Sequence, residues 1–247
     1  MNIVVFGANG PTGRLVTRLA LDAGAGVTAV TRAPESFPLH HERLRVEGGD
    51  VFDQASVDRA VEGQDAVLSA LGVPYSREAI TTYSVGARAM LAAMERHGVR
   101  RLVCVSSSAV DPTAGPHGGF FFERVLQPFV ANVLGRSLYD DMKRMESIVA
   151  ASGTEWTVLR PSGLFDADAV SDYQVAERYL PPKFTARIDL ADAMVRQLDD
   201  ARFVGRVAAV ATTQGAPSVA QLMMREAFKR PPKQAKASAA RGTVPAE

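Results

Sequence analysis

The chain has few residues suited to covalent cross-links or metal sites. It contains one cysteine, Cys104, and four histidines among 247 residues. A single cysteine excludes an internal disulfide, so a reducing compartment is expected. Cys104 lies in an apolar strand pattern, which indicates an inert core thiol. The loop histidines have no further ligands at metal-binding spacing, so no metal site is predicted.

Excess charge and long apolar runs are also scarce. The 28 basic and 27 acidic side chains give a formal net charge of +1, which disfavours a nucleic-acid partner held by a large basic surface. The longest apolar run near mid-chain, residues 120–134, is broken by Glu123, Arg124 and Pro128 and is too short and too charged to span a bilayer. Met1-Asn2 leads directly into the first expected strand, so we expect no cleavable leader. We expect a soluble, cytoplasmic protein with a small-molecule substrate, no nucleic-acid or membrane partner, and a monomeric or homodimeric state.

Short β-branched runs alternate with longer helical patterns from the first residues onward. The expected strands cover residues 3–6, 27–31, 44–46, 66–68, 101–105, 156–159 and 207–210. The expected helices cover residues 12–23, a segment through 57 and 61, 78–98, 120–151, 190–198 and 219–228. This alternation requires crossover connections, so we predict an α/β fold of the doubly wound Rossmann type, with a mostly parallel sheet and helices on both faces. One domain is expected over residues 1–230, with a disordered tail over 231–247.

A glycine-rich turn follows the first strand and opens the first helix. It reads Gly7-Ala8-Asn9-Gly10-Pro11-Thr12-Gly13. The glycines allow a tight turn and close approach of the backbone to a pyrophosphate, and the helix N-terminus offers that anion free N–H donors. The strand before it and the helix after it make this match stronger than the glycines alone. We predict a bound nicotinamide dinucleotide here, contacted by Gly7, Asn9, Gly10, Pro11, Thr12 and Gly13.

The end of the second strand indicates which dinucleotide is bound. Thr31-Arg32 stands where a NAD-preferring site usually has Asp or Glu for the ribose 2′-hydroxyl. An arginine pairs instead with a 2′-phosphate, and the alternative is a solvated surface arginine. We therefore expect NADP(H), with NAD(H) disfavoured.

More cofactor contacts are expected where the following strands end. A carboxylate after the third strand accepts from the exocyclic amine of adenine, and the next valine packs on the ring. Small residues after the fourth strand let the backbone pass beside the cofactor, because strand C-terminal ends form the ligand edge of such a sheet. The predicted contacts are Asp50, Val51, Ala70, Leu71, Gly72 and Ser106.

Two features are candidates for catalysis. The first is the run Ser106-Ser107-Ser108 after the fifth strand. Strand alternation predicts Ser106 and Ser108 on one face and Ser107 on the other. A serine here either polarises a substrate carbonyl or only satisfies backbone groups of the loop.

The second candidate is the pair Tyr139 and Lys143, four residues apart on a predicted helix and therefore on one face. A lysine ammonium beside a phenol lowers the pKa of the phenol, which suits a proton donor to a carbonyl. The alternative is that Tyr139 is a packing or surface residue.

These residues together resemble the short-chain dehydrogenase/reductase superfamily. The match is closest to its atypical branch, the NAD(P)H-binding, NmrA-like proteins that include biliverdin-IXβ/flavin reductase, and it covers the chain to about Phe228. The resemblance implies NADP(H) binding and hydride transfer. In the wider superfamily a serine polarises the carbonyl, a tyrosine donates the proton and a lysine holds the ribose. Those roles fall on Ser107 or Ser108, Tyr139 and Lys143.

The leading prediction is an NADPH-dependent oxidoreductase that reduces a small carbonyl, quinone-like or flavin-like acceptor. The biliverdin/flavin reductase subgroup lacks the Tyr–Lys pair, so its specificity is not carried over. One alternative is a non-catalytic NADP(H)-binding redox sensor, as among NmrA-like relatives. Another is an NAD(P)-dependent epimerase or dehydratase, although the chain after Pro161 is short for a nucleotide-sugar subdomain.

Overall fold

The computed structural model describes residues 1–76, 78–111, 136–177, 179–180, 184–213 and 215. The strands are β1 (Asn2–Phe6), β2 (Gly26–Thr31), β3 (Leu44–Gly48), β4 (Ala66–Ser69), β5 (Arg101–Val105), β6 (Glu155–Pro161), β7 (Gly163–Phe165), β8 (Tyr173–Glu177), β9 (Phe184–Ala186) and β10 (Arg206–Thr212). The α-helices are α1 (Pro11–Asp22), α2 (Gln54–Val61), α3 (Thr82–His97), α5 (Arg136–Ala150) and α6 (Arg187–Arg196). Short 3₁₀ helices are η1 (Pro34–Ser36), η2 (Ser108–Val110) and η5 (Ala201–Phe203).

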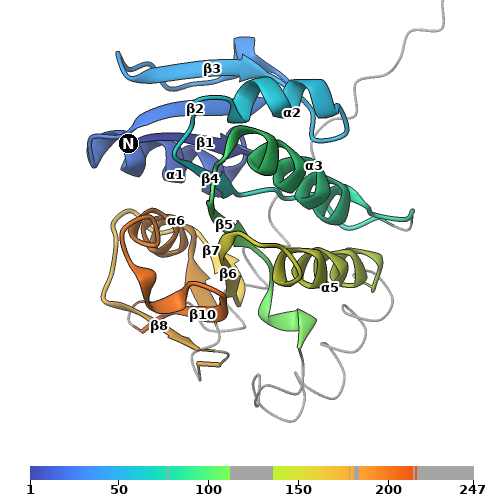
Figure 1. The fold of residues 1–247 in the computed structure, drawn as a ribbon. Coiled ribbons are helices and arrows are strands. Elements are labelled where there is room, and N and C mark those ends of the chain that lie inside the picture. Colours follow the sequence, from blue (N-terminus) through green and yellow to red (C-terminus); the bar gives the residue numbers. More distant parts are fainter. Residues whose placement is uncertain (77, 112–135, 178, 181–183, 214, 216–247) are drawn as a thin grey trace, which may run out of the picture. The chain divides into compact units, whose positions relative to one another are not determined.

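Eight strands form one sheet in the order β3-β2-β1-β4-β5-β6-β10-β8 (Figure 1). Neighbouring strands run parallel, except that β8 is antiparallel to β10. The chain enters the sheet at β1, moves outward to β3, and then crosses to β4 on the other side of β1. This confirms the predicted doubly wound Rossmann fold, in which ligands bind at the carboxyl ends of the strands where the order reverses.

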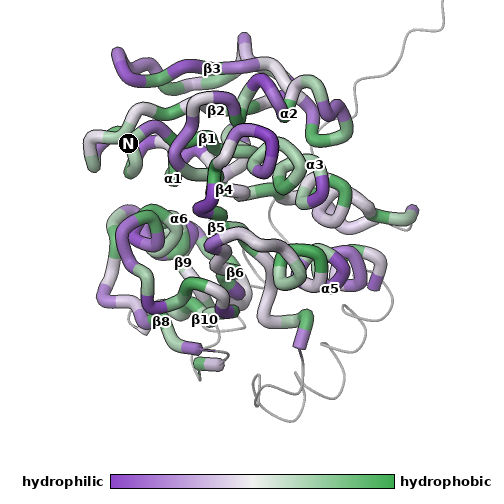
Figure 2. Tube along the Cα trace, viewed as in Figure 1, coloured by the Kyte–Doolittle hydropathy of each residue, from purple (hydrophilic) through white to green (hydrophobic). Residues whose placement is uncertain are grey.

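Helices cover both faces of the sheet (Figure 1). On β1, Val4 and Phe6 belong to the core shared with α2, α3 and α5, whereas Ile3 and Val5 belong to the core shared with α1 and α6. All four side chains are fully buried, which explains why the strand is an unbroken apolar run. Figure 2 shows hydrophobic residues along the inner strands and a more hydrophilic trace at the edge strand β3.

Most predicted boundaries agree with the structure within about three residues, but the start of one helix differs more. The helix expected from residue 78 begins at Thr82, because α5 binds the backbone just before it: Ile80 N–H donates to Ser137 Oγ at 2.7 Å, and Arg144 donates to the Ile80 carbonyl oxygen. Strands β7, β8 and β9 were not predicted. The helix expected over 120–151 is described only from Arg136, and the predictions for 219–228 and 231–247 lie outside the described residues.

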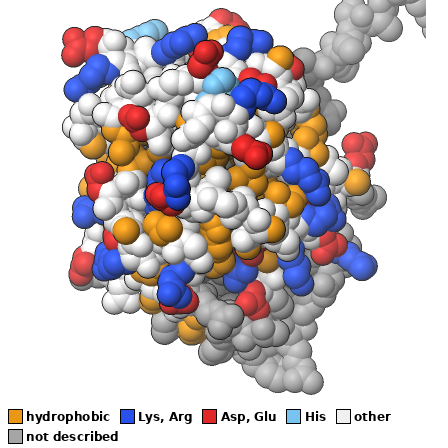
Figure 3. Space-filling model, viewed as in Figure 1, with side chains coloured by type: hydrophobic (Ala, Val, Ile, Leu, Met, Phe, Trp, Pro, Cys, Tyr) orange, Lys and Arg blue, Asp and Glu red, His pale blue; other side chains and the backbone are white. Residues whose placement is uncertain are grey.

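No helix of the described part combines the length and the apolar character that crossing a bilayer requires. On the face drawn in Figure 3, basic and acidic side chains are interspersed with apolar ones.

Candidate functional site

The glycine-rich turn lies directly after β1 and is packed against neighbouring backbone. Gly7 has φ +73°, and a Cβ there would lie 2.7 Å from the carbonyl oxygen of Ala70 at the end of β4. A Cβ on Gly13 would lie 2.8 Å from Cα of Ala8. The N–H of Gly10 donates to the Gly7 carbonyl oxygen at 3.0 Å and closes the turn. Only glycine fits these positions, so the backbone forms a tight cradle at the start of α1.

The cradle has the donors that an anion requires. Helix α1 begins with Pro11 in its first turn, and no side chain caps it at Gly10. The first N–H groups of the helix therefore remain without an intrahelical or side-chain partner. This arrangement suits a diphosphate.

Asn9 joins the cradle to the segment after β2. Its side-chain amide nitrogen donates to Ser36 Oγ at 3.2 Å, and its oxygen accepts from Arg14 Nε and Nη2 at 2.9 and 2.6 Å. The sequence reasoning missed Arg14. A cation in the first turn of a helix is electrostatically unfavourable, and that unusual placement was the signal.

Arg32, the predicted 2′-phosphate ligand, follows β2 and is exposed. Within the part of the chain that the structure describes, its guanidinium has no ion pair or hydrogen bond. The side chain is thus available to an anion at the edge where β2 ends.

Asp50 and Val51 follow β3 in a rigid turn. The Asp50 carboxylate accepts from Phe52 N–H at 3.0 Å, and the Ser56 hydroxyl binds both the N–H and the carbonyl of Asp50. Val51 is buried beside α3, where a Cβ added at Gly86 would lie 3.3 Å from Val51 Cβ and 3.0 Å from Leu71 Cδ1. Residues predicted from the ends of β3 and β4 therefore lie close together over Gly86.

The three serines after β5 occupy different environments. Ser106 is 3% exposed, and its hydroxyl has no hydrogen-bond partner among the described residues. Ser107 Oγ accepts from Ala109 N–H at 3.2 Å and caps η2, which begins at Ser108. β5 ends at Val105, but Ser107 keeps an extended backbone, with φ −149° and ψ 146°, so the face on which each serine lies stays a prediction. The unpartnered Ser106 hydroxyl fits a polar group of a ligand, since buried polar atoms are normally satisfied.

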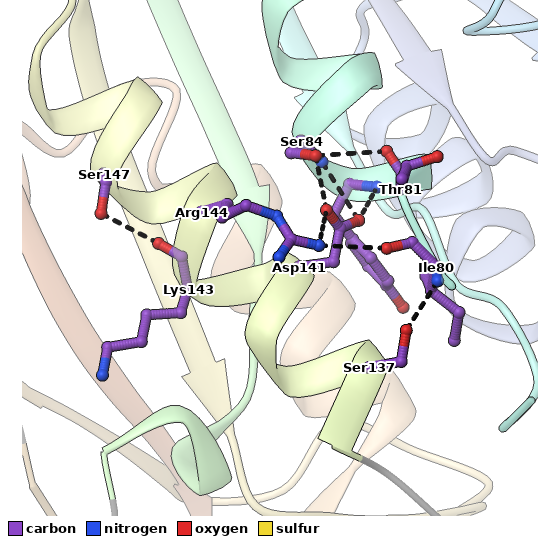
Figure 4. A network of polar contacts seen from close by, with 9 residues as sticks. Ile80, Thr81, Ser84, Ser137, Asp141, Lys143, Arg144 and Ser147 are labelled. Atoms are coloured by element: carbon purple, nitrogen blue, oxygen red, sulfur yellow. Dashed lines mark hydrogen bonds and ion pairs between the residues drawn. The ribbon is translucent and has the colours of Figure 1, made fainter. Parts of the chain in front are cut away.

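Tyr139 and Lys143 both lie on α5, but the structure does not couple them as predicted. The Tyr139 hydroxyl is 3.0 Å from that of Tyr75, and Lys143 is exposed. Figure 4 shows the Lys143 side chain extending away from Asp141 and Arg144. Burial, together with the hydrogen bond to Tyr75, raises the pKa of Tyr139 above its ordinary value. The expectation of a lowered pKa was therefore wrong, because desolvation raises it and Lys143 is not among the groups that act on this phenol.

A family model described as NAD(P)H-binding matches residues 7–201, from the glycine turn to beyond α6. The chain belongs to the NAD(P)H-binding family. Among solved structures it is similar to a short-chain dehydrogenase/reductase from Veillonella parvula in complex with NADP, with a TM-score of 0.71, 18% identity, and coverage of 86% of this chain and 95% of that one. At that identity the likeness shows the fold.

Two curated relatives of this NAD(P)H-binding chain are oxidoreductases by name. One is the (4-alkanoyl-5-oxo-2,5-dihydrofuran-3-yl)methyl phosphate reductase of Streptomyces griseus, 30% identical over 159 residues, or 64% of this chain. The chain spans 46% of the length of that relative. The other is oxidoreductase stcQ of Emericella nidulans, 27% identical over 224 residues, covering 81% of this chain and 78% of the relative.

The residues present fit the cofactor that the family binds. The glycine cradle admits no side chain, the first turn of α1 offers free N–H groups, and the buried Ser106 hydroxyl lacks a partner within the described chain. These features lie where β1 and β5 end, at one edge of the sheet. Which individual residues touch the cofactor stays a prediction.

A second polar group on α5 fixes this edge, and the sequence reasoning did not assign it a role. We call it the Asp141 cluster: Ser137, Asp141 and Arg144 of α5 with Ile80, Tyr83 and Ser84 (Figure 4). The Asp141 carboxylate is 0% exposed and accepts from Tyr83 N–H at 2.8 Å, from Ser84 N–H at 3.3 Å and from the Ser84 hydroxyl. It thus caps α3, whose own N-cap residue provides no side-chain hydrogen bond.

An ion pair fixes the segment after β5. Arg160, at the end of β6, donates to both carboxylate oxygens of Glu146 on α5, at 2.9 and 2.6 Å, and lies 3.5 Å from Asp111. Burial alone would lower the pKa of Arg160, but the hydrogen bond and charge of Glu146 raise it above the ordinary value. The guanidinium therefore stays charged and holds the residues that follow Ser106–Ser108.

The remaining predictions concern metals and the thiol. Among the described residues no group of three His, Cys, Asp or Glu side chains is arranged to hold a metal ion. Cys104 lies in the core, and its burial raises the pKa of the thiol to about 12. An inert thiol is the consequence.

Proposed function

We propose that this chain is an NADPH-dependent reductase of a small carbonyl, quinone-like or flavin-like compound. The observation that carries the proposal is the position of a protonated phenol. Tyr139 is hydrogen-bonded to Tyr75, which lies on the segment leaving β4 at the cofactor edge of the sheet. A dinucleotide cradle and a proton donor thus belong to the same edge.

The cofactor would be held by groups already in place. The cradle from Gly7 to Gly13 suits the diphosphate, Arg32 suits a 2′-phosphate, and Asp50 with Val51 borders the adenine. Ser106 and the backbone of residues 70–72 would border the rest of the cofactor. When bound, the reduced nicotinamide supplies a hydride to the acceptor.

Tyr139 supplies the proton in this proposal. Because its pKa is raised, the phenol keeps its proton at neutral pH and donates a hydrogen bond to the acceptor oxygen. As that oxygen gains alkoxide character it becomes a stronger base than a phenolate, so proton transfer follows. The names of the Streptomyces and Emericella relatives, a reductase and an oxidoreductase, support this class of reaction.

The test is NADPH oxidation, followed at the nicotinamide absorbance, with a panel of quinones, flavins, aldehydes and ketones. Turnover is expected, and Tyr139→Phe should lower kcat by about 10²-fold or more, the usual contribution of a general acid, while the Kd for NADPH stays nearly constant. Tyr173→Phe, on β8, is the matched control. Unchanged kcat in Tyr139→Phe would remove the proton-donor assignment.

Two observations favour a second candidate, an NADP(H)-binding sensor without turnover. Lys143 is not coupled to Tyr139, and the Ser107 hydroxyl is engaged as the cap of η2. Tight NADPH binding without oxidation by any acceptor in the panel would support the sensor and overturn the reductase.

A further inference from the structure

The partner of the Tyr139 hydroxyl is another phenol. Its oxygen lies 3.0 Å from that of Tyr75, and the two rings meet edge to face with centroids 6.4 Å apart and planes inclined by 66°. Either hydroxyl is able to donate. Tyr139 packs against the core beneath α3 and α5, whereas Tyr75 is 53% exposed. The pair therefore connects a partly buried phenol to solvent.

Hydrogen bonds on either side of Tyr75 along the chain hold its ring against that of Tyr139. The Tyr83 hydroxyl accepts from Val73 N–H at 3.4 Å, two residues before Tyr75. The Asp141 cluster fixes the same segment further along, at Ile80 and Ser84. Val73 is thus attached to α3 and Ile80 to α5, on either side of Tyr75, so that the hydroxyl of Tyr75 is presented to Tyr139.

We propose that Tyr75 is the proton relay to Tyr139. This inference rests on the proposed reductase activity. Tyr75 acts through Tyr139 and not on the substrate, so it is a positioning residue whose hydroxyl orients the phenol and restores its proton.

One hydride and one proton are transferred in each turnover. The acceptor carbon receives a hydride, with its two electrons, from the NADPH that the reaction consumes, and the C=O π bond opens. The O–H bond of Tyr139 breaks and its proton forms the new O–H bond of the product. In the same step Tyr75 donates its proton to the Tyr139 oxygen, and it regains one from solvent. The net reaction consumes one NADPH and one solvent proton for each acceptor.

The charge on Tyr139 is controlled by few groups. Tyr75, from the segment after β4, and Tyr83, from α3, are the titratable groups that act on its phenol, and both raise its pKa. No cation of the described residues lowers it. A phenolate at Tyr139 is therefore unfavourable and takes up a proton from a nearby donor. Tyr75 is the hydroxyl in hydrogen-bond contact with it.

The experiment compares Tyr75→Phe with the wild type in the NADPH oxidation assay in H₂O and D₂O mixtures. The substitution keeps the ring and removes the hydroxyl. We expect kcat to fall by about tenfold or more, with an unchanged KM for NADPH, and a curved proton inventory to become linear because one of two moving protons is lost. Tyr173→Phe should retain the wild-type kcat and curvature.

A second measurement does not depend on turnover. In protein labelled with ¹³C at tyrosine Cζ, Tyr75→Phe should shift the Tyr139 resonance, and Tyr173→Phe should leave it in place. Wild-type kcat with a curved inventory in Tyr75→Phe, or an unmoved Tyr139 resonance, overturns the relay. If Tyr139→Phe still loses turnover in that case, the proposed function stands alone. If the wild-type protein binds NADPH but oxidises it with none of the acceptors in the panel, the function and the relay are overturned together.

Discussion

Asp141→Ala is expected to lower the free energy of unfolding by about 2–4 kcal/mol, from the loss of a helix cap and an unpaired buried hydroxyl. The carboxylate is fully buried and accepts from two backbone N–H groups of α3, from the Ser84 hydroxyl and from Arg144 at 3.2 Å. Loss of the helix cap alone costs about 1 kcal/mol. The Ser84 hydroxyl, left buried and unpaired, adds about 1–3 kcal/mol. Arg144 is half exposed, so its contribution is small because water screens it.

Thermal and urea unfolding measure this effect. In a chain of this size each 1 kcal/mol shifts Tm by about 2–4 °C, so a loss of about 4–16 °C is expected. The neighbouring Asp140 is the matched control, since its side chain is 57% exposed and lies 3.8 Å from Arg136. Asp140→Ala should change stability by less than about 0.5 kcal/mol. Equal losses in the two variants, or a loss below about 1 kcal/mol for Asp141→Ala, would refute the capping role.

Three further predictions concern the cofactor site and the core. Gly13→Ala should weaken NADPH binding by about tenfold or more, because a Cβ would meet immovable backbone at Ala8; Gly153→Ala, with open space around it, should bind normally. Arg32→Glu should weaken NADPH by about 100-fold, from the loss of a charge-assisted contact, and leave NADH unchanged; equal weakening would contradict the assignment. Cys104 should resist alkylation at pH 8 until the chain unfolds. Burial raises the pKa of this thiol to about 12, so its contribution to stability is complete below the ordinary thiol pKa and is lost as pH rises toward 12; prompt labelling of the native protein would contradict this.

Local patterns determined the order of elements and the position of the cofactor edge. An apolar run such as residues 3–6 is stable only when both faces are covered, and this already predicts a central parallel strand. The glycine turn was also predicted from the sequence, because the backbone at Gly7 and Gly13 leaves no space for a side chain. Asp53 caps α2 and Gly98 ends α3, and such caps depend on neighbours within a few residues.

Tertiary contacts decided what those patterns left open. The start of α3 moved to Thr82 because groups on α5, more than fifty residues away in sequence, bind the backbone before it. Among the described residues the Ser106 hydroxyl is buried without a partner, whereas the Ser107 hydroxyl caps η2. The Tyr139 hydroxyl contacts that of Tyr75 and not Lys143. Spacing along a helix fixes only which residues share a face, whereas the contacts of a phenol depend on the packing of the whole core. The sequence thus determined where the dinucleotide belongs, and long-range packing determined which side chains act beside it.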